Sequence, residues 1–412
     1  MPAAPTRCAG RLRERDRLRW RVGDPGDPAA LLAELLAAHG LPVGELTRLG
    51  ARPARHDPGT VCGAAVFVSA AAGARLVGAP TGAASPAPAV PDLVAVVYEH
   101  ARDGSGPPPP PAPFSGGPRD AAVGEGDAPG TGAAAAGWRL GDWVESWSPA
   151  AHAAAVERAR AAIGRGDVYQ VNVVGHASAR YAGDPLPALA RLAALPGARY
   201  GGVLSGPGWA VGCASPETLV EVSAGRVRTR PIKGTRPATA AGRRELLASP
   251  KERAEHVMIV DLARNDLARL ARTGSVRVDE LYGIRRWCDL WQAESTVSAV
   301  LDDGMGLPEL LRAVCPGGSV TGAPKLAALE QIAALEPVGR GASMGALGWI
   351  GPDHLDLGLT IRTAAADAER LHLWAGGGIT WGSDPHAEVA EAAAKAAPLR
   401  ARLAGNAVTP PG

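Results

Sequence analysis

The chain has 412 residues, of which 46% are hydrophobic, and its 43 basic and 41 acidic residues leave a net charge of +2. This length can bury one large core or two ordinary ones, and the near-neutral charge gives no reason to expect nucleic acid or an anionic membrane as a partner. No apolar run approaches the ~20 residues that span a bilayer, and the basic N-terminal stretch lacks the apolar segment of a secretory signal.

The cysteines bear on the cellular compartment. The chain has five of them, scattered and never spaced as CxxC. This pattern predicts reduced thiols, a cytoplasmic location and no structural zinc.

Residues 1–102 predict an N-terminal subdomain that packs on a larger core. A helix is expected after Asp27, because Asp27 is a favourable capping residue, Pro28 suits the first helical position and Gly40 suits the end. The stretches "TVCGAAVFVSA" and "DLVAVVYEH" predict buried strands. Residues 103–137 are rich in Pro and Gly and poor in large apolar residues, which predicts a linker or a disordered loop.

Residues 138–405 predict the main domain, followed by a tail at 406–412. In this domain, the long helix that begins after Ser249 is expected to end at Gly274. Most strands are joined by hairpins, with long helices between groups of strands, so the predicted fold class is α+β with large antiparallel sheets flanked by helices. Three helices are expected, each opened by a capping residue that precedes Pro: Ser148, Ser249 and Asp384.

Lysine is scarce in this chain. A desolvated Lys can lose its proton and act as a nucleophile, which Arg effectively cannot do. Lys233 stands between a strand-like run and a Gly-Thr turn in "PIKGTRPA", so it is either a buried nucleophile or a surface charge at a strand end. Only four of the 43 basic residues are Lys: Lys233, Lys251, Lys325 and Lys395.

The stretch "TLVEVSAGRVRTRPI" predicts a hairpin that brings a carboxyl group toward Lys233. Glu217 and Lys233 lie eight residues on either side of Gly225, at the predicted turn. Cross-strand register then places them opposite each other or within one residue of it, with Cβ atoms ~5 Å apart. The pair is equally consistent with an acid beside a nucleophile and with an ordinary ion pair.

Three carboxylates on two predicted helices, Glu255, Glu388 and Glu391, form a candidate metal site. Several carboxylates without Cys or His favour Mg²⁺ over Zn²⁺. Two of them also have a structural explanation, because Glu391 is spaced to pair with Lys395 and Glu388 suits the positive end of a helix. Glu255 has the weakest such explanation, since apolar residues surround it in the sequence.

Arg362 lies in the apolar stretch "LTIRTAA", where an unpaired guanidinium is costly. It is therefore expected to have an anionic partner, either a carboxylate side chain or a bound ligand carboxylate. The glycine-rich turns "PGGSVTGAPK" and "AGGGIT" could present free N–H groups to such a ligand.

Nine stretches, taken in order, resemble the chorismate-utilising enzymes and, among these, component I of aminodeoxychorismate synthase. The resemblance covers residues 138–403. It implies an α+β fold of large antiparallel sheets, with residues 138–405 as a chorismate-binding catalytic domain. The stretches are "GDVYQVN", "ASPE", "PIKGTRP", "AEHVMIVDLARNDL", "TGSVRV", "PGGSVTGAPK", "GALGWI", "IRTA" and "AGGGITWGSDPHAEVAE".

The resemblance implies a role for each candidate residue in making 4-amino-4-deoxychorismate. Lys233 would be a covalent nucleophile toward chorismate, and Glu217 the general acid. Gln170 stands where water-using relatives carry a Lys base; a Gln cannot deprotonate water, so ammonia is the implied second nucleophile. Mg²⁺ is the implied cofactor, held by Glu255, Glu388 and Glu391. The implied substrate-binding residues are Gln170, Thr235, Thr321, Gly322, Arg362, Gly376, Gly377, Gly378 and Lys395.

The chain has no glutaminase signature, so the implied partner is a separate glutamine amidotransferase subunit that supplies ammonia. Gln292 and Ser343 stand where the family usually has His and Tyr. An anthranilate synthase component I and a non-catalytic chorismate-binding paralogue therefore stay open as alternatives. No N-terminal feedback motif supports regulation by tryptophan.

Overall fold

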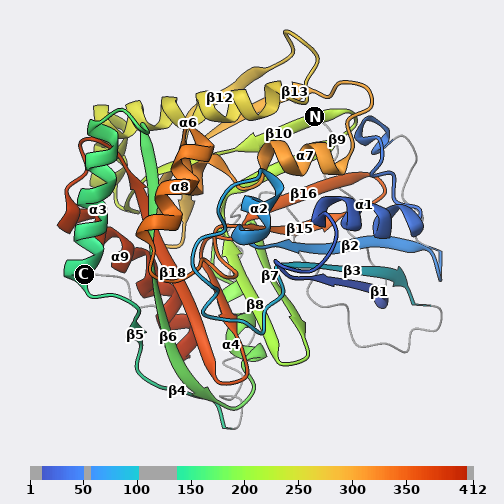
Figure 1. The fold of residues 1–412 in the computed structure, drawn as a ribbon, viewed down its shortest axis with the longest axis horizontal. Helices are drawn as coiled ribbons and strands as arrows, with labels where there is room; N and C mark the ends of the chain where they lie inside the picture. The colour runs from blue at the N-terminus through green and yellow to red at the C-terminus, as the bar shows by residue number, and fades with distance from the viewer. Residues whose placement is uncertain (1–11, 51–56, 102–136, 406–412) are drawn as a thin grey trace.

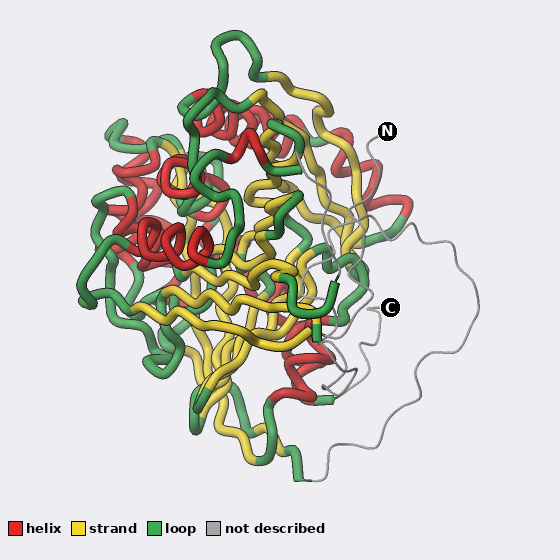
Figure 2. The backbone as a smooth tube through the Cα atoms, turned by 90° about the vertical axis from the view of Figure 1, so that its right-hand side faces the viewer, coloured by secondary structure: helices red, strands yellow, loops and turns green. Residues whose placement is uncertain are grey.

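The computed structural model describes residues 12–50, 57–101 and 137–405. Its strands form two large antiparallel sheets in the centre of the molecule, with helices outside them (Figure 1, Figure 2). This is the α+β architecture that the sequence predicts. The predicted linker, apart from Gly137, and the predicted tail lie outside the described residues.

The larger sheet joins N-terminal strands to strands of the main domain. In order across the sheet, its strands are β1 (Leu12–Trp20), β3 (Leu93–His100), β2 (Val61–Val68), β15 (Ala346–Ile350), β16 (His354–Leu359), β9 (Thr218–Ser223), β10 (Arg226–Arg230), β13 (Leu290–Val300) and β11 (Ile232–Pro237), with β12 (Arg277–Trp287) also paired to β13. The junction is the antiparallel pairing of β2 with β15. The N-terminal strands β1, β2 and β3 thus extend the same sheet that carries Lys233.

The smaller sheet packs against the larger one. Its strands are β14 (Gly322–Ala323), β6 (Gln170–Ala182), β18 (Arg370–Ile379), β17 (Thr363–Ala366), β8 (Trp209–Ser215) and β7 (Tyr200–Gly206), with β4 (Arg139–Leu140) and β5 (Val144–Glu145) paired to β6. The buried ring of Tyr200 on β7 lies against Gly358 on β16, where a Cβ would come within 2.2 Å of it. Glycine at this position therefore lets the two sheets approach and share one core.

Nine α-helices cover the sheets within the described residues. They are α1 (Pro28–Ala38), α2 (Ala70–Leu76), α3 (Pro149–Gly164), α4 (Leu186–Ala193), α5 (Ala240–Ala248), α6 (Pro250–Ala268), α7 (Leu307–Val314), α8 (Lys325–Leu335) and α9 (Pro385–Ala404). The predicted caps are confirmed, since each accepts a hydrogen bond from a backbone N–H in the first turn: Asp27, Ser148, Ser249 and Asp384.

The predicted end of the long helix α6 is wrong. The helix ends at Ala268, well before Gly274. The residues that follow pair with the end of β13 instead: Ala271 forms a β-bridge with Leu301, and Arg272 donates its backbone N–H to Val300 at 3.0 Å. A long-range pairing thus ends the helix before its glycine signal.

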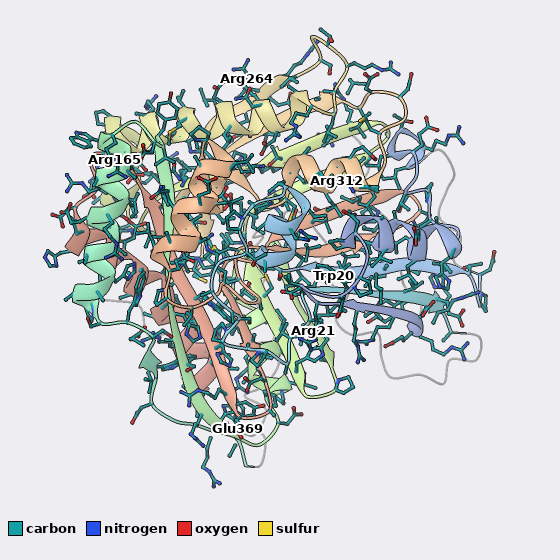
Figure 3. The ribbon with its side chains drawn as sticks, in the orientation of Figure 1. Trp20, Arg21, Arg165, Arg264, Arg312 and Glu369 are labelled. Carbon is teal, nitrogen blue, oxygen red and sulfur yellow. The ribbon has the colours of Figure 1, made fainter. Side chains whose placement is uncertain are left out.

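Apolar side chains fill the interior, and each fully buried Leu or Val stabilises the fold by roughly 1.5–3 kcal/mol. Charged side chains such as Arg165, Arg264 and Glu369 extend from the periphery (Figure 3). Among the helices of the described residues, none combines the length and the apolar character needed to cross a membrane.

Candidate active site

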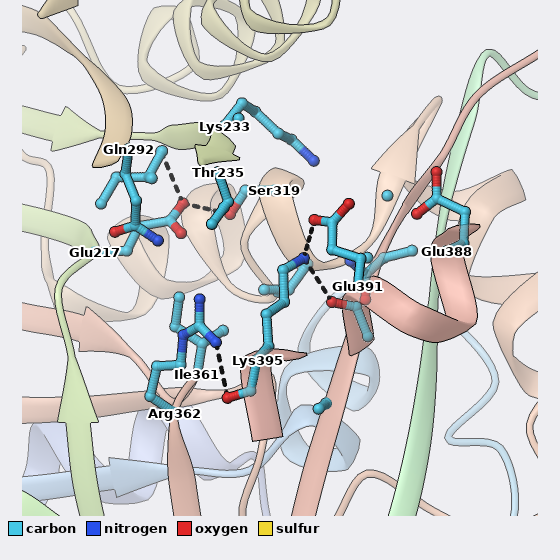
Figure 4. Close-up of a pocket in the computed structure, with 18 of the residues that line it drawn as sticks. Glu217, Lys233, Thr235, Gln292, Ser319, Ile361, Arg362, Glu388, Glu391 and Lys395 are labelled. Atoms are coloured by element: carbon cyan, nitrogen blue, oxygen red, sulfur yellow. Dashed lines mark hydrogen bonds and ion pairs between the residues drawn. The ribbon is translucent and has the colours of Figure 1, made fainter. Parts of the chain in front are cut away.

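A cavity opens between the two sheets and the first turns of α6 and α9. It has about 120 Å³ of space for water-sized molecules. Side chains from separate elements extend into it, with Lys233 and Glu217 on one side and Lys395, Glu391 and Glu388 on the other (Figure 4). The predicted site residues that line it are Glu217, Lys233, Thr235, Glu255, Arg362, Gly376, Gly377, Gly378, Glu388, Glu391 and Lys395.

Lys233 reaches the cavity from β11, and its predicted cross-strand pairing with Glu217 is wrong. The β9–β10 hairpin forms with the predicted turn, but its register stops before Pro231. Because Pro231 has no N–H to continue the ladder, the chain leaves the hairpin there. β11 then pairs with β13, which places Lys233 opposite Ala293. Glu217 still lies near β11, since the Ile232 N–H donates to Glu217 Oε1 at 3.3 Å.

The environment of Lys233 favours its neutral form. Burial lowers the pKa of the Lys233 amine below its ordinary value, against the opposing charges of Glu255 and Glu217. A lowered pKa raises the fraction of neutral amine, which is the nucleophilic form of Lys. The amine points into the cavity (Figure 4), as a nucleophile must.

Glu217 has the properties of a proton donor. It lies between β8 and β9 with only 4% of its surface exposed. Burial raises the pKa of its carboxyl to about 7, even though Ser319 Oγ donates a hydrogen bond to Oε1 at 2.6 Å and the Lys233 charge opposes the rise. A carboxyl with a pKa near neutrality can hold a proton and release it during a reaction.

Gly378 is the point where Lys233 and Gln170 meet. A Cβ on Gly378 would lie 2.6 Å from Gln170 Nε2 and 2.7 Å from Lys233 Nζ. Gln170 is 1% exposed, and neither polar atom of its amide has a hydrogen-bond partner among the described residues. The absence of a side chain at Gly378 therefore leaves the space that the amide and the amine occupy.

Arg362 is buried without a carboxylate partner among the described residues. It connects β16 to β17 with a backbone φ of 53°, and its guanidinium lies 4.5 Å above the ring of Trp287. Burial lowers its pKa to about 10, and Nη1 donates to the Lys395 carbonyl at 3.1 Å. Of the two predicted kinds of anionic partner, a ligand carboxylate is the one this geometry favours.

Two lysines lie against the three carboxylates of the candidate metal site. Lys251 Nζ lies 3.7 Å from Glu255 Oε1 and 4.0 Å from Glu388 Oε1. Lys395 Nζ lies 2.7 Å from Glu391 Oε1. Burial raises the pKa of Glu388; it acts in the same direction on Glu391, but there the Lys395 charge prevails and the pKa is lowered.

The donor chemistry of this region fits Mg²⁺. All three glutamates line one cavity that has no His or Cys in its wall, and a hard cation prefers oxygen ligands. Within the described ranges, no three acidic, His or Cys side chains already lie close enough together to chelate a metal. The Lys251 ammonium sits between two of the glutamates, in a place suited to a cation.

Three predicted site residues do not line the cavity: Gln170, Thr321 and Gly322; Ser343, one of the two family departures, does not line it either. Thr321 is 1% exposed and donates its hydroxyl to the Gly317 carbonyl at 2.9 Å. Gly322 pairs with Val171, and Ser343 is fully buried with its hydroxyl donated to the Thr360 carbonyl at 3.0 Å. Gln292, the other family departure, does line the cavity.

The cavity is also lined by residues that were not predicted as site residues, among them Asn172, Ser319 and Lys251. Asn172 and Ser319 border the cavity near Lys233 and Glu217, and Lys251 borders it near the glutamates. The sequence held a signal for two of them: Asn172 shares a strand face with Gln170, and Lys251 is one of four lysines. Ser319 carried no signal, because its contact with Glu217 joins residues 102 positions apart.

Comparison with known proteins identifies the family. The model of the chorismate binding enzymes matches residues 120–401. Component 1 of aminodeoxychorismate synthase from Bacillus subtilis (strain 168) is 38% identical over 256 residues, which cover 60% of this chain and 54% of that protein. Component 1 of anthranilate synthase from Streptomyces coelicolor is 40% identical over 257 residues, covering 60% and 50%. The chain thus spans about half the length of the curated relatives it matches.

Solved structures share the fold along nearly the whole chain. Anthranilate synthase component I from Streptococcus pneumoniae aligns with a TM-score of 0.72 and 24% identity, covering 97% of this chain and 93% of that one. The menaquinone-specific isochorismate synthase from Escherichia coli aligns with a TM-score of 0.58 and 16% identity, covering 96% and 95%. With a family model that matches more than half of its length, the chain belongs to the chorismate binding enzymes.

Proposed function

We propose that this chain is component I of an aminodeoxychorismate synthase, which converts chorismate and ammonia into 4-amino-4-deoxychorismate and water. The observation that carries the proposal is the Lys233 amine, whose pKa is lowered, in one cavity with the Glu217 carboxyl, whose pKa is about 7. Relatives named as component 1 of aminodeoxychorismate synthase, at 36–41% identity, support the choice.

In the first step the neutral Lys233 amine attacks C2 of chorismate. The ring double bond shifts, and the C4 hydroxyl leaves as water with the proton that Glu217 donates. Glu217 is suited to this task because a carboxyl with a pKa of about 7 is partly protonated at neutral pH. Covalent catalysis of this kind divides one difficult substitution into two easier ones.

In the second step ammonia attacks C4, and the ring double bond moves back to its original position. The bond between C2 and the lysine nitrogen breaks, which releases the neutral Lys233 amine. The new C4 ammonium group gives one proton to the Glu217 carboxylate, which restores the acid used in the first step. The hydroxyl is thereby exchanged for an amino group. The free Lys233 amine is ready for another cycle.

Other residues of the cavity would bind the dianionic substrate. Arg362 has no carboxylate partner among the described residues and lies where a substrate carboxylate would satisfy it. When bound by Glu255, Glu388 and Glu391, Mg²⁺ would neutralise the ring carboxylate. Ammonia would come from a glutamine amidotransferase subunit.

The experiment is chorismate turnover by the purified chain with Mg²⁺ and excess ammonium salt, which bypasses the amidotransferase. We expect chorismate to be consumed and 4-amino-4-deoxychorismate to be identified by mass. Lys233→Ala and Lys233→Arg should both lose turnover at least 100-fold, because Arg keeps the charge but cannot supply a neutral amine. Without ammonia, the wild-type chain should gain the mass of chorismate less water. Full activity of Lys233→Arg would refute the covalent role.

An anthranilate synthase component I is the second candidate, favoured by the relative of that name at 40% identity. It would release anthranilate and pyruvate, and fluorescence of the aromatic product distinguishes it. A chain that leaves chorismate untouched under these conditions would instead be the non-catalytic paralogue that Gln292 and Ser343 left open.

A further inference from the structure

Two neighbouring amide side chains on β6 have polar atoms without partners. Gln170 and Asn172 are 1% and 6% exposed. Oε1 and Nε2 of Gln170 and Oδ1 of Asn172 have no hydrogen-bond partner among the described residues. Alternate residues of a strand share one face, so both amides face the same side of β6. Buried amide oxygens without partners indicate that a donor is still to be bound.

Asn172 lines the cavity that holds the Lys233 amine, and the Gln170 amide lies beside that amine at Gly378. In the β6–β18 ladder, Asn172 is paired with Gly378. Gln170 Nε2 and Lys233 Nζ converge on the same glycine. Asn172, Lys233 and Gly378 all line the cavity. A small molecule held by the two amides would therefore lie beside the amine.

The backbone of Asn172 is held firmly on both sides. Its N–H donates to the Thr321 carbonyl at 2.7 Å, and its carbonyl accepts from Arg340 Nη2 at 2.9 Å. Arg340 in turn pairs with Glu336 at 2.7 Å, and both are only 8% exposed. This buried ion pair fixes the position from which the Asn172 side chain projects.

We propose that Asn172, together with Gln170, forms the subsite that binds ammonia for attack on C4. Ammonia has three N–H donors and one lone pair. Amide oxygens accept the N–H groups, which leaves the lone pair free to form the bond to carbon. Neither amide can take a proton from water, so the same pair does not activate water as a competitor. This inference rests on the proposed function and adds a residue, Asn172, to it.

Asn172→Leu tests the subsite, because Leu keeps the shape of Asn and removes its acceptor. With ammonium salt as the nitrogen source, we expect the KM for ammonium to rise about tenfold and the KM for chorismate to change less than twofold. Asn172→Ala removes the acceptor without adding bulk and serves if the Leu variant melts at a lower temperature. Asn265→Leu, an exposed position on α6, is the matched control.

The outcomes separate this inference from the function it rests on. An unchanged KM for ammonium in both Asn172 variants, or an equal rise in both KM values, would overturn the subsite while the proposed function stands. No turnover by the wild-type chain with ammonium and Mg²⁺ would overturn the proposed function, and the ammonia subsite with it. A selective rise in the ammonium KM supports both.

Discussion

Gly378→Ala tests the geometry of the reaction space with one added methyl group. The new Cβ would lie 2.7 Å from Lys233 Nζ, whereas ordinary contacts of this kind begin at 3.4 Å. The amine must therefore move by roughly 0.7 Å, and the Gln170 amide by a similar distance. Both atoms are at the ends of flexible side chains, so we expect little loss of stability. A displacement approaching 1 Å costs on the order of 10²-fold in rate, so kcat should fall roughly 10²-fold.

The assay is ammonium-driven consumption of chorismate, with thermal denaturation measured alongside. Gly382→Ala is the matched control, because a Cβ there would meet no atom within 4 Å. It should leave both kcat and the melting temperature unchanged. If Gly378→Ala kept more than half of the wild-type kcat, the amine would not need its present position, and the reasoning about Lys233 would fail.

Three further predictions concern charge and pH. The Glu217 carboxyl has a pKa of about 7, so kcat/KM should fall above pH ~7 as this acid loses its proton. Glu217→Gln should lower kcat/KM by ~10²–10⁴-fold and remove this decrease with pH. If the variant kept the same decrease, the decrease would belong to another group. Lys251→Met removes an ammonium that lies between Glu255 and Glu388, so calorimetry should find that Mg²⁺ binds several-fold more tightly to the variant. Lys251→Arg, which keeps the charge, is the control. Weaker Mg²⁺ binding by Lys251→Met would contradict the prediction. Burial lowers the pKa of His176 to about 3, so on acidification this residue takes up its proton in the unfolded state before it does so in the folded state. The free energy of unfolding should therefore fall between pH ~6.5 and ~3, by up to about 5 kcal/mol from this residue. Urea denaturation measures the free energy of unfolding at each pH, and in His176→Asn it should depend less steeply on pH. An equally steep pH dependence in the variant and the wild type would refute the role of His176.

Local features of the fold could be predicted because local chemistry determines them. Ser148 and Asp384 were identified as caps since a side-chain oxygen before Pro satisfies N–H groups only a few residues away. The turn at Gly225 was identified for a similar reason. The family's motif residues Lys233 and Glu217 were also found, and the structure places both in one cavity.

Long-range pairing is where the sequence was insufficient. The choice of β13 as the partner of β11, and the bridge of Ala271 to Leu301 that follows α6, both depend on strands far away in the chain. Ser319 was missed for the same reason, because no local pattern encodes its contact with Glu217. Asn172 shares a strand face with Gln170, but its place opposite Gly378 also depends on long-range pairing.

The pairing of β2 with β15 limits how this protein can be recombined with its relatives. A chain that began after residue 101 would leave the edge of β15 that faces β2 without hydrogen-bond partners, while its other edge stayed paired with β16. Such an open border invites other molecules to add their own strands and aggregate. Chimeras that exchange the first hundred residues must therefore supply a substitute strand of matching length and twist. The junction between the two parent sequences should lie in a loop and not within the paired strands β2 and β15.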